Sequence, residues 1–269
     1  MPELPEVETI ARDLAPRLRG RRIARIRHDD YPPVFDRHSL APAVLRGRTI
    51  EAVRRAGKYV LLEFDRGLRC AVHLRMTGAL LFDERAHTPR YTRALLRFAD
   101  GSALAFADVR KFGRMRIFRG APEDAITIGI DPFDRRLTPT LLKTMSARNR
   151  RSAVKVWLLN QRYLGGVGNI YACEALYYAG IRPKRRIANL STPERERLLG
   201  SLRAVLRKAI RHRGSSVDDY VDAAGEQGEF QKQLAVYGRA GMPCRRCGTP
   251  IRRIVLAQRG TFYCPSCQR

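Results

Sequence analysis

The sequence has no long hydrophobic run and no apolar leader. No stretch reaches the roughly eighteen consecutive apolar residues that a membrane-spanning helix needs. The acidic segment after Met1 does not resemble a signal peptide. We therefore expect a cytoplasmic protein that has no membrane partner. We also expect a monomer, and the charge described below adds the expectation that it is nucleoid-associated.

Cysteine is also sparse, with six residues in 269. In a chain without an export signal, cysteines are more often metal ligands than disulfide partners. Cys244 and Cys247 form one C-x2-C pair, and Cys264 and Cys267 form a second pair after sixteen intervening residues. This is the spacing of a four-thiolate zinc site. Four thiolates leave no open coordination position, so we predict one structural zinc ion and not a catalytic one.

Acidic residues are half as frequent as basic ones, with 26 Asp and Glu against 52 Lys and Arg, which gives a net charge of +26. An ordinary solvated surface does not explain so large an imbalance. Most of the excess is arginine, whose planar guanidinium binds phosphate at two points. Nucleic acid is therefore the expected partner. The segment 244–269 has six arginines and no acid, so we expect it to face a phosphate backbone.

The first half of the chain is predicted to be one helix followed by strands. Apolar residues at helical spacing begin at Pro5 and end near Gly20, and Pro16 should kink this helix. Four strands are predicted over residues 58–64, 68–74, 93–99 and 102–107. Asp100-Gly101 is a strong hairpin signal. We expect a largely antiparallel sandwich over residues 21–120 with the helix against it.

The second half is predicted to be helical. Turn-forming residues mark 122–139 as a linker. Helices are expected over 138–146, from 152 onwards, over 169–179 and over 192–212. Ser152 and Thr192 are the expected caps of the second and fourth helices. Residues 214–229 should form a mobile loop, and strands near 251–256 and 261–263 a hairpin in the cysteine-rich tail.

The first six residues carry the candidate reactive group. Removal of Met1 would leave the secondary amine of Pro2 as the N-terminus. A free α-amine titrates near about 8 and can attack an electrophilic carbon to give a Schiff base. Glu3 is a candidate acid or base, and Glu6 lies one turn further on. The alternative is that proline and acids simply begin a helix.

These features together resemble the formamidopyrimidine-DNA glycosylase family. The matching motifs are MPELPEVET at the start, DVRKFG at 108–113, GVGNIYACEAL at 166–176 and the terminal cysteine pairs. The resemblance implies an α+β multidomain fold. It has an N-terminal β-sandwich with a packed helix over 1–134, a helix–two-turn–helix domain over 135–233 and a zinc-ribbon finger over 234–269.

The resemblance also implies an activity: excision of oxidised purines (8-oxoguanine and formamidopyrimidines) from duplex DNA, followed by cleavage of the abasic site. Pro2 would attack the anomeric carbon, and Glu3 would exchange protons with the opening sugar. Glu6 is also expected among the catalytic residues. Lys58 is a candidate acid in β-elimination, and Arg259 is assigned as the proton donor in δ-elimination. Because arginine stays protonated, phosphate stabilisation is the simpler role for Arg259.

A base within a duplex must be extruded before reaction, and something must fill the gap. Met76, Arg110 and Phe112 match the family's intercalating residues, although Met76 and Phe112 could instead belong to the core. Further matches to DNA-contacting positions are implied at Lys58, His73, Asn169 and Arg259, with Arg150 or Arg151 nearby. Asn169 could also simply cap its helix. Lys155 and the loop 215–228 lie where the family recognises the base, and that loop favours purine lesions.

Three positions depart from the family pattern. Tyr91 replaces a DNA-contacting histidine, Asp131 replaces a glutamate in the linker, and Cys173 occupies a usually acidic position. Cys70 and Cys173 are otherwise expected to be buried thiols. Two alternatives remain open: an endonuclease VIII-like glycosylase for oxidised pyrimidines, and a non-catalytic protein that binds damaged DNA through its positive charge.

Overall fold

The computed structural model describes residues 1–217 and 220–269, and its contacts divide the chain into two compact units. The first unit comprises Met1–Thr127 and His212–Gln231, and the second comprises Ile128–Arg211 and Lys232–Arg269. Within the described residues, no helix combines the length and the apolar character needed to cross a bilayer.

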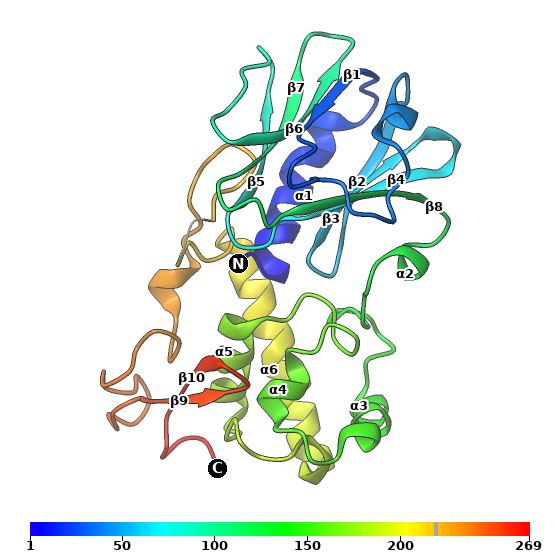
Figure 1. The fold of residues 1–269 in the computed structure, drawn as a ribbon. Coiled ribbons are helices and arrows are strands. Elements are labelled where there is room, and N and C mark those ends of the chain that lie inside the picture. Colours follow the sequence, from blue (N-terminus) through cyan, green and yellow to red (C-terminus); the bar gives the residue numbers. More distant parts are fainter. Residues whose placement is uncertain (218–219) are drawn as a thin grey trace. The chain divides into compact units, whose positions relative to one another are not determined.

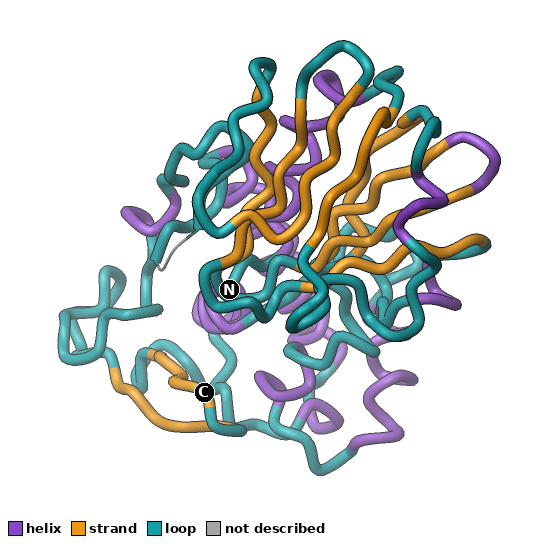
Figure 2. The backbone as a smooth tube through the Cα atoms, turned by 45° about the horizontal axis from the view of Figure 1, so that its top comes forward, coloured by secondary structure: helices purple, strands orange, loops and turns teal. Residues whose placement is uncertain are grey.

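Two four-stranded antiparallel sheets form the first unit (Figures 1 and 2). The strand order is β1-β6-β7-β5 in one sheet and β2-β3-β4-β8 in the other. The strands are β1 (Ile23–His28), β2 (Ile50–Ala56), β3 (Tyr59–Phe64), β4 (Leu68–His73), β5 (Gly78–Asp83), β6 (Thr92–Phe98), β7 (Ala103–Asp108) and β8 (Arg114–Arg119). The four strands and the hairpin at Asp100-Gly101 predicted from the sequence are confirmed within about a residue at each end.

Helix α1 (Leu4–Leu18) packs against β2 and β3. Its apolar face, which includes Val7, Ile10 and Leu14, joins both sheets in one continuous core. The predicted helix is therefore confirmed, and it contains Pro16. A four-residue helix, α2 (Pro122–Ala125), lies in the segment predicted as a linker; its proline occupies the first turn, where no N–H is needed.

The second unit contains α3 (Pro139–Ser146), α4 (Val154–Leu158), α5 (Asn169–Ala179), α6 (Thr192–Arg211) and the hairpin of β9 (Arg252–Leu256) and β10 (Arg259–Tyr263). These elements were all predicted, with ends that differ by one or two residues. The turn of the hairpin places Ala257 and Gln258 at φ of 47° and 59°. Two consecutive left-handed residues are typical of a tight two-residue hairpin turn.

Two predicted helix caps are wrong. The residue before α4 is Ala153, which makes no side-chain cap bond, so Ser152 is not the cap. At α6, Ser191 and Glu194 form the reciprocal bonds instead of Thr192: the Ser191 N–H donates to Glu194 and the Glu194 N–H to Ser191 Oγ, at 2.8 and 3.4 Å. This serine–glutamate pair three residues apart is a capping box that begins one residue earlier.

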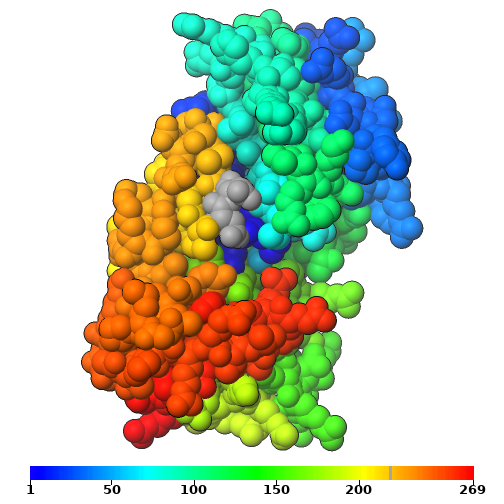
Figure 3. Space-filling view, turned by 60° about the vertical axis from the view of Figure 1, so that its left-hand side comes forward, coloured from blue at the N-terminus to red at the C-terminus, as the bar shows by residue number. Residues whose placement is uncertain are grey.

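The predicted mobile loop over 214–229 includes Asp218 and Asp219, which lie outside the described residues. The rest of the loop packs with the first unit, where the Phe82 N–H donates to Ala223 O. In Figure 3 this yellow-to-orange segment lies against the cyan part of the sandwich.

Candidate functional site

The N-terminal segment is fixed by reciprocal hydrogen bonds. Glu3 is the N-cap of α1 and forms a capping box with Glu6: its side chain accepts from the Glu6 N–H, and Glu6 Oε2 accepts from the Glu3 N–H at 2.8 Å. Pro2, Glu3 and Glu6 are all buried. The helix-start and reactive-terminus interpretations are therefore compatible, because the capping box also fixes the backbone that carries Pro2.

Glu6 also reaches the loop after α6. Its Oε1 accepts a hydrogen bond from the Ser215 N–H at 2.7 Å. Gly214 adopts φ +82°, and a Cβ there would lie 2.7 Å from Glu6 Oε1; a Cβ on Gly228 would lie 2.4 Å from Gly214 O. Both glycines are needed for this close packing. This contact was not predicted from the sequence, because Glu6 and Ser215 are far apart in the chain and no local pattern joins them.

Asp108 forms hydrogen bonds to both turns that carry Met76, Arg110 and Phe112, the expected intercalating residues, which we call the wedge residues. Its buried carboxylate accepts hydrogen bonds from Thr77 Oγ1 at 2.5 Å and from the Gly113 N–H at 2.6 Å. Phe112 is 50% exposed, and the Arg110 guanidinium carbon lies 4.9 Å from its ring centroid. A phenylalanine in the core would be covered, so its exposure favours the wedge interpretation over the core interpretation.

Met76 is half-buried in the turn between β4 and β5, next to Thr77. Thr77 therefore ties this turn to the 109–113 loop through Asp108. Asp108 belongs to one of the motifs that carry the family resemblance, but its contact with Thr77 was not predicted from the sequence.

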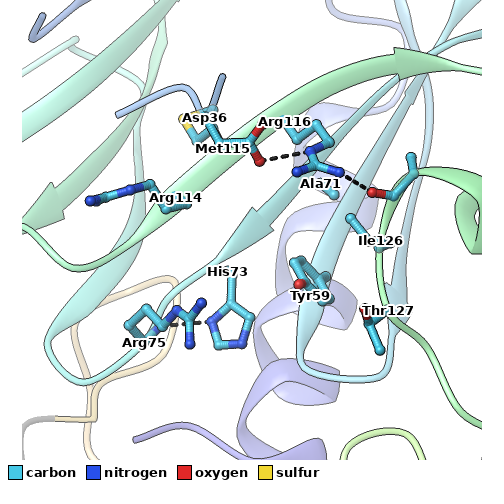
Figure 4. Close-up of a pocket in the computed structure, with 11 residues that line it drawn as sticks. Asp36, Tyr59, Ala71, His73, Arg75, Arg114, Met115, Arg116, Ile126 and Thr127 are labelled. Atoms are coloured by element: carbon cyan, nitrogen blue, oxygen red, sulfur yellow. Dashed lines mark hydrogen bonds and ion pairs between the residues drawn. The ribbon is translucent and has the colours of Figure 1, made fainter. Parts of the chain in front are cut away.

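His73 lines a basic cavity of about 260 Å3 on the outer face of the β2-β3-β4-β8 sheet (Figure 4). Its Nδ1 accepts a hydrogen bond from the Arg75 N–H at 3.1 Å. This bond leaves Nε2 as the protonated nitrogen of the neutral ring. Burial, with repulsion from Arg75 and Lys58, lowers the pKa of His73 to about 3. His73 can therefore offer an anion one neutral N–H donor.

Lys58 is also buried, at 6% exposure. Its charge is one of those that act on His73, so the two expected DNA-contacting residues lie close together. Tyr59, the cross-strand partner of His73, packs edge-on against its ring with centroids 4.8 Å apart. Arg116 lines the same cavity and forms an ion pair with Asp36 at 2.7 Å.

In the second unit, strand β10 brings together Lys155, Asn169 and Arg259. Asn169 Nδ2 donates to Gly260 O at 3.0 Å. The N-cap of α5 is Gly168, so Asn169 is the first helical residue and does not cap the helix. Arg259 is exposed at the start of β10, directly before Gly260.

Lys155 is fully buried, and its ammonium donates to Thr261 Oγ1 at 2.6 Å and to Gly260 O at 3.3 Å. These bonds fix the zinc hairpin against α4. Contact between Lys155 and a DNA base stays a prediction.

Tyr91 is 47% exposed in the left-handed region at φ +63°, and the Arg90 guanidinium stacks on its ring at 4.7 Å. Arg150 and Arg151 are exposed and line a cavity of about 400 Å3 between α3 and the 186–189 turn. The Asp131 carboxylate accepts from the Phe133 N–H at 2.8 Å.

The four tail cysteines form a metal site. One ligand atom from each of Cys244, Cys247, Cys264 and Cys267 lies within 4.8 Å of the others. Backbone N–H groups donate to Cys244 Sγ and Cys264 Sγ at 3.4 Å, as expected where sulfurs carry thiolate charge. The site fits one structural zinc ion, which these residues hold with no position left for substrate.

Gln268 and Arg269 attach this metal-binding segment to the end of α5. Gln268 is buried; its amide accepts from the Cys264 N–H at 2.8 Å and donates to Ile181 O at 2.9 Å. The backbone of Arg269 exchanges hydrogen bonds with Gly180 and Arg182 at the end of α5.

Glu174 was missed by the sequence interpretation. Its buried carboxylate accepts from the N–H groups of Ala235, Val236 and Tyr237 at 2.8–2.9 Å. Burial raises the pKa of Glu174, although these donors oppose the shift. Glu174 thus attaches the segment that leads to the zinc finger to α5. Cys70 and Cys173 are buried thiols, as predicted.

Three sequence models of known families match the chain. The formamidopyrimidine-DNA glycosylase N-terminal domain matches residues 1–115, the H2TH domain of the same enzymes matches 128–221, and a zinc finger found in FPG and IleRS matches 241–269. The predicted α+β fold with these three parts is thereby confirmed.

Whole-chain relatives agree with the domain matches. Formamidopyrimidine-DNA glycosylases of Chloroflexus aggregans and Herpetosiphon aurantiacus are each 43% identical over all of this chain and over 98% and 100% of their own lengths. The crystal structure of MutM (FPG) from Thermus thermophilus superposes with a TM-score of 0.88 at 38% identity, covering 99% of this chain and 98% of that one. A complex of Lactococcus lactis Fpg with abasic-site DNA gives a TM-score of 0.86 at 34% identity, covering 99% of each chain.

Proposed function

The chain belongs to the formamidopyrimidine-DNA glycosylase family, and from that membership we propose that it is a base-excision-repair glycosylase and abasic-site lyase for oxidised purines in duplex DNA. The observation that carries the proposal is the buried N-terminal turn, in which Glu3 and Glu6 fix the backbone next to Pro2. A reactive amine needs such a fixed position, because orientation supplies much of the rate of a covalent step.

The proposed chemistry begins at Pro2 once Met1 has been removed. The amine forms a bond to the anomeric carbon as the bond to the damaged base breaks, and the sugar ring opens to an iminium. Glu3 exchanges the proton with the sugar oxygen. β-Elimination then expels the 3′ phosphate and δ-elimination the 5′ phosphate, with Lys58 and Arg259 as the expected proton-transfer and phosphate-binding groups.

The other site residues are proposed to hold the DNA. Met76, Arg110 and Phe112 would occupy the gap left by the extruded nucleotide, which offsets unstacking that costs a few kcal/mol per step. His73 and Asn169 would bind backbone phosphates, and Arg150, Arg151, Lys155 and Tyr91 complete the expected DNA-contacting set. Asn169 lies at a helix start, where free N–H groups favour an anion.

We assign the catalytic role to residues 1–134, DNA binding by the helix–two-turn–helix domain to 135–233 and the zinc finger to 234–269. The described residues of the loop 215–228, which is proposed to recognise the base, pack with the first unit. Solved Lactococcus lactis Fpg complexes contain Fapy-dG DNA or abasic-site DNA, and we propose duplex DNA of this kind as the partner. We also propose that the protein acts as a monomer in the cytoplasm at the nucleoid.

Borohydride trapping tests the reaction. Incubation with abasic-site DNA and borohydride should give a covalent adduct through Pro2, and Pro2→Gly should reduce adduct formation far more than it reduces DNA binding. Mass measurement of the N-terminus must first show that Met1 is absent. Correctly processed protein that gives no adduct would support the non-catalytic DNA-binding alternative.

Lesion class is tested separately. Excision of 8-oxoguanine opposite cytosine should exceed excision of thymine glycol. The reverse order would favour the endonuclease VIII-like alternative.

A further inference from the structure

A cluster of three arginines on the first unit has no part in the proposed reaction. Arg25 and Arg27 on β1 and Arg97 on β6 surround a cavity of about 400 Å3 on the outer face of the β1-β6-β7-β5 sheet. Leu95 lines the cavity with them and packs on Ala103 and Ala105 of the next strand. We call Arg25, Arg27, Arg97 and Leu95 the sheet-face pocket.

Within residues 1–217 and 220–269, none of the three guanidinium groups takes part in an ion pair or a side-chain hydrogen bond. Neighbouring arginines behave differently: Arg93, also on β6, donates to Asp29 at 2.8 Å. The sheet-face pocket is thus a local excess of positive charge.

The strand register makes this excess unfavourable in the isolated protein. Arg25 lies directly opposite Arg97, and Arg27 directly opposite Leu95. Like charges on directly opposed residues destabilise a sheet. Protection of an exposed sheet edge would account for arginines on β1, which is an edge strand. It does not account for Arg97, because β6 is paired on both sides.

We propose that the sheet-face pocket binds an acidic peptide segment of a partner protein, with carboxylates on the guanidinium groups and one apolar side chain towards Leu95. Guanidinium forks bind carboxylates in a bidentate manner. Leu95 in the lining favours a peptide over a DNA backbone, because a phosphate group has no apolar part that could pack on this side chain. The wedge residues lie elsewhere in this unit, in the turns that precede β5 and follow β7.

The test uses the full-length protein and a fluorescein-labelled peptide of Asp and Glu residues with a central Leu-Phe pair. A second probe replaces Leu-Phe by Ser-Ser, and a third is an undamaged DNA duplex. The variant R25Q/R27Q/R97Q is compared with R46Q/R66Q/R85Q. The latter removes three exposed arginines of the same unit whose side chains make no ion pair or hydrogen bond among the described residues.

Fluorescence anisotropy should show roughly tenfold or greater loss of Leu-Phe peptide affinity in the pocket variant and less than about twofold loss in the control variant. The Ser-Ser peptide should bind more weakly to the unaltered protein. Glycosylase activity and duplex binding should stay within about twofold for both variants. Melting temperatures confirm that both are folded.

Equal losses in the two variants would overturn the proposal in favour of nonspecific attraction. Equal binding of the two peptides would overturn the apolar contact on which it depends. Weaker duplex binding in the pocket variant, with peptide binding unchanged, would make the pocket a DNA contact instead.

Discussion

The Glu6 carboxylate joins two segments that are more than two hundred residues apart in sequence: it accepts the Glu3 N–H at 2.8 Å and the Ser215 N–H at 2.7 Å. One buried side chain therefore sets the position of both the proposed nucleophile and the proposed base-recognition loop. Disturbing it should affect excision of a base more than reaction at an existing abasic site, which needs no base recognition.

Glu6→Gln is the direct test of this link. The amide has one oxygen to accept hydrogen bonds, so one of the two N–H donors is left without its acceptor, at a cost of about 1–3 kcal/mol. We expect a lower melting temperature and a larger loss in 8-oxoguanine excision than in abasic-site cleavage. Glu51→Gln, at an exposed position of β2, is the control and should change neither. Equal losses in both assays would contradict the role assigned to the loop contact.

His73 should make stability depend on pH. Its pKa is about 3 in the folded protein and near 6.5 when exposed. Because the folded-state pKa is lowered, the neutral ring stabilises the fold fully above pH 6.5, and this contribution is lost as the pH falls towards 3. At pH 5 the loss should be about 2 kcal/mol. Denaturant unfolding at pH 7 and pH 5 should show this difference in the free energy of unfolding. The difference should be smaller in the His73→Gln variant.

The tautomer of His73 gives an independent check. Gln places its amide N–H near the position of Nε2, whereas Asn places it near Nδ1. If Nε2–H binds a phosphate, His73→Gln should retain more DNA affinity than His73→Asn, measured at pH 7. The opposite order would mean that Nδ1 faces the anion.

Replacement of Gly113 and of Gly200 by alanine should change the stability of the protein in opposite directions. A Cβ on Gly113 would lie 2.3 Å from the Phe106 ring, whereas a Cβ on Gly200 in α6 meets nothing within 4 Å. Gly113→Ala should therefore destabilise the protein by about 1–3 kcal/mol and weaken DNA binding by shifting the Phe112 loop. Gly200→Ala should stabilise it by about 0.5–1 kcal/mol. Thermal unfolding measures both, and stabilisation by Gly113→Ala would refute the packing argument.

Lys155→Met separates a structural role from a role in base recognition. Its ammonium donates to Thr261 and Gly260 from a buried position. If its function is to hold the zinc hairpin, the variant should lose affinity for lesion and abasic-site DNA by similar factors. A loss confined to 8-oxoguanine excision would instead show direct recognition of the base. Thr261→Val removes the same bond from the other side and should reproduce the first pattern.

Local patterns predicted most of the fold. The apolar spacing of α1, the Asp100-Gly101 turn and the C-x2-C pairs each determine structure over a few residues, so they could be found without coordinates. The predictions that Ser152 and Thr192 cap their helices were wrong, because several neighbouring residues can cap a helix and tertiary contacts select one of them. Ser191 and Glu194 have the spacing of a capping box, which predicts a cap at Ser191 and not at Thr192.

Residues of the candidate site could be predicted only where they belong to a recognisable sequence motif. The contacts of Glu6 with Ser215, of Lys155 with Thr261 and of Glu174 with the 235–237 backbone join distant segments. A buried polar side chain finds its partner through the fold, and its own sequence neighbourhood carries no trace of that partner. Arg25, Arg27 and Arg97 form no ion pair among the residues that the structure describes, and their clustering became visible only once the strand register was known.

The pairing of Gln268 and Arg269 with the end of α5 and with the metal-binding turn has a practical consequence. Proteolytic cleavage after Cys267 during purification would remove the Gln268 amide, which accepts from the Cys264 N–H and donates to Ile181 O. Preparations cleaved to different extents would then differ in zinc content without any mutation. Intact mass and zinc stoichiometry should therefore be matched before the activities of any two preparations are compared.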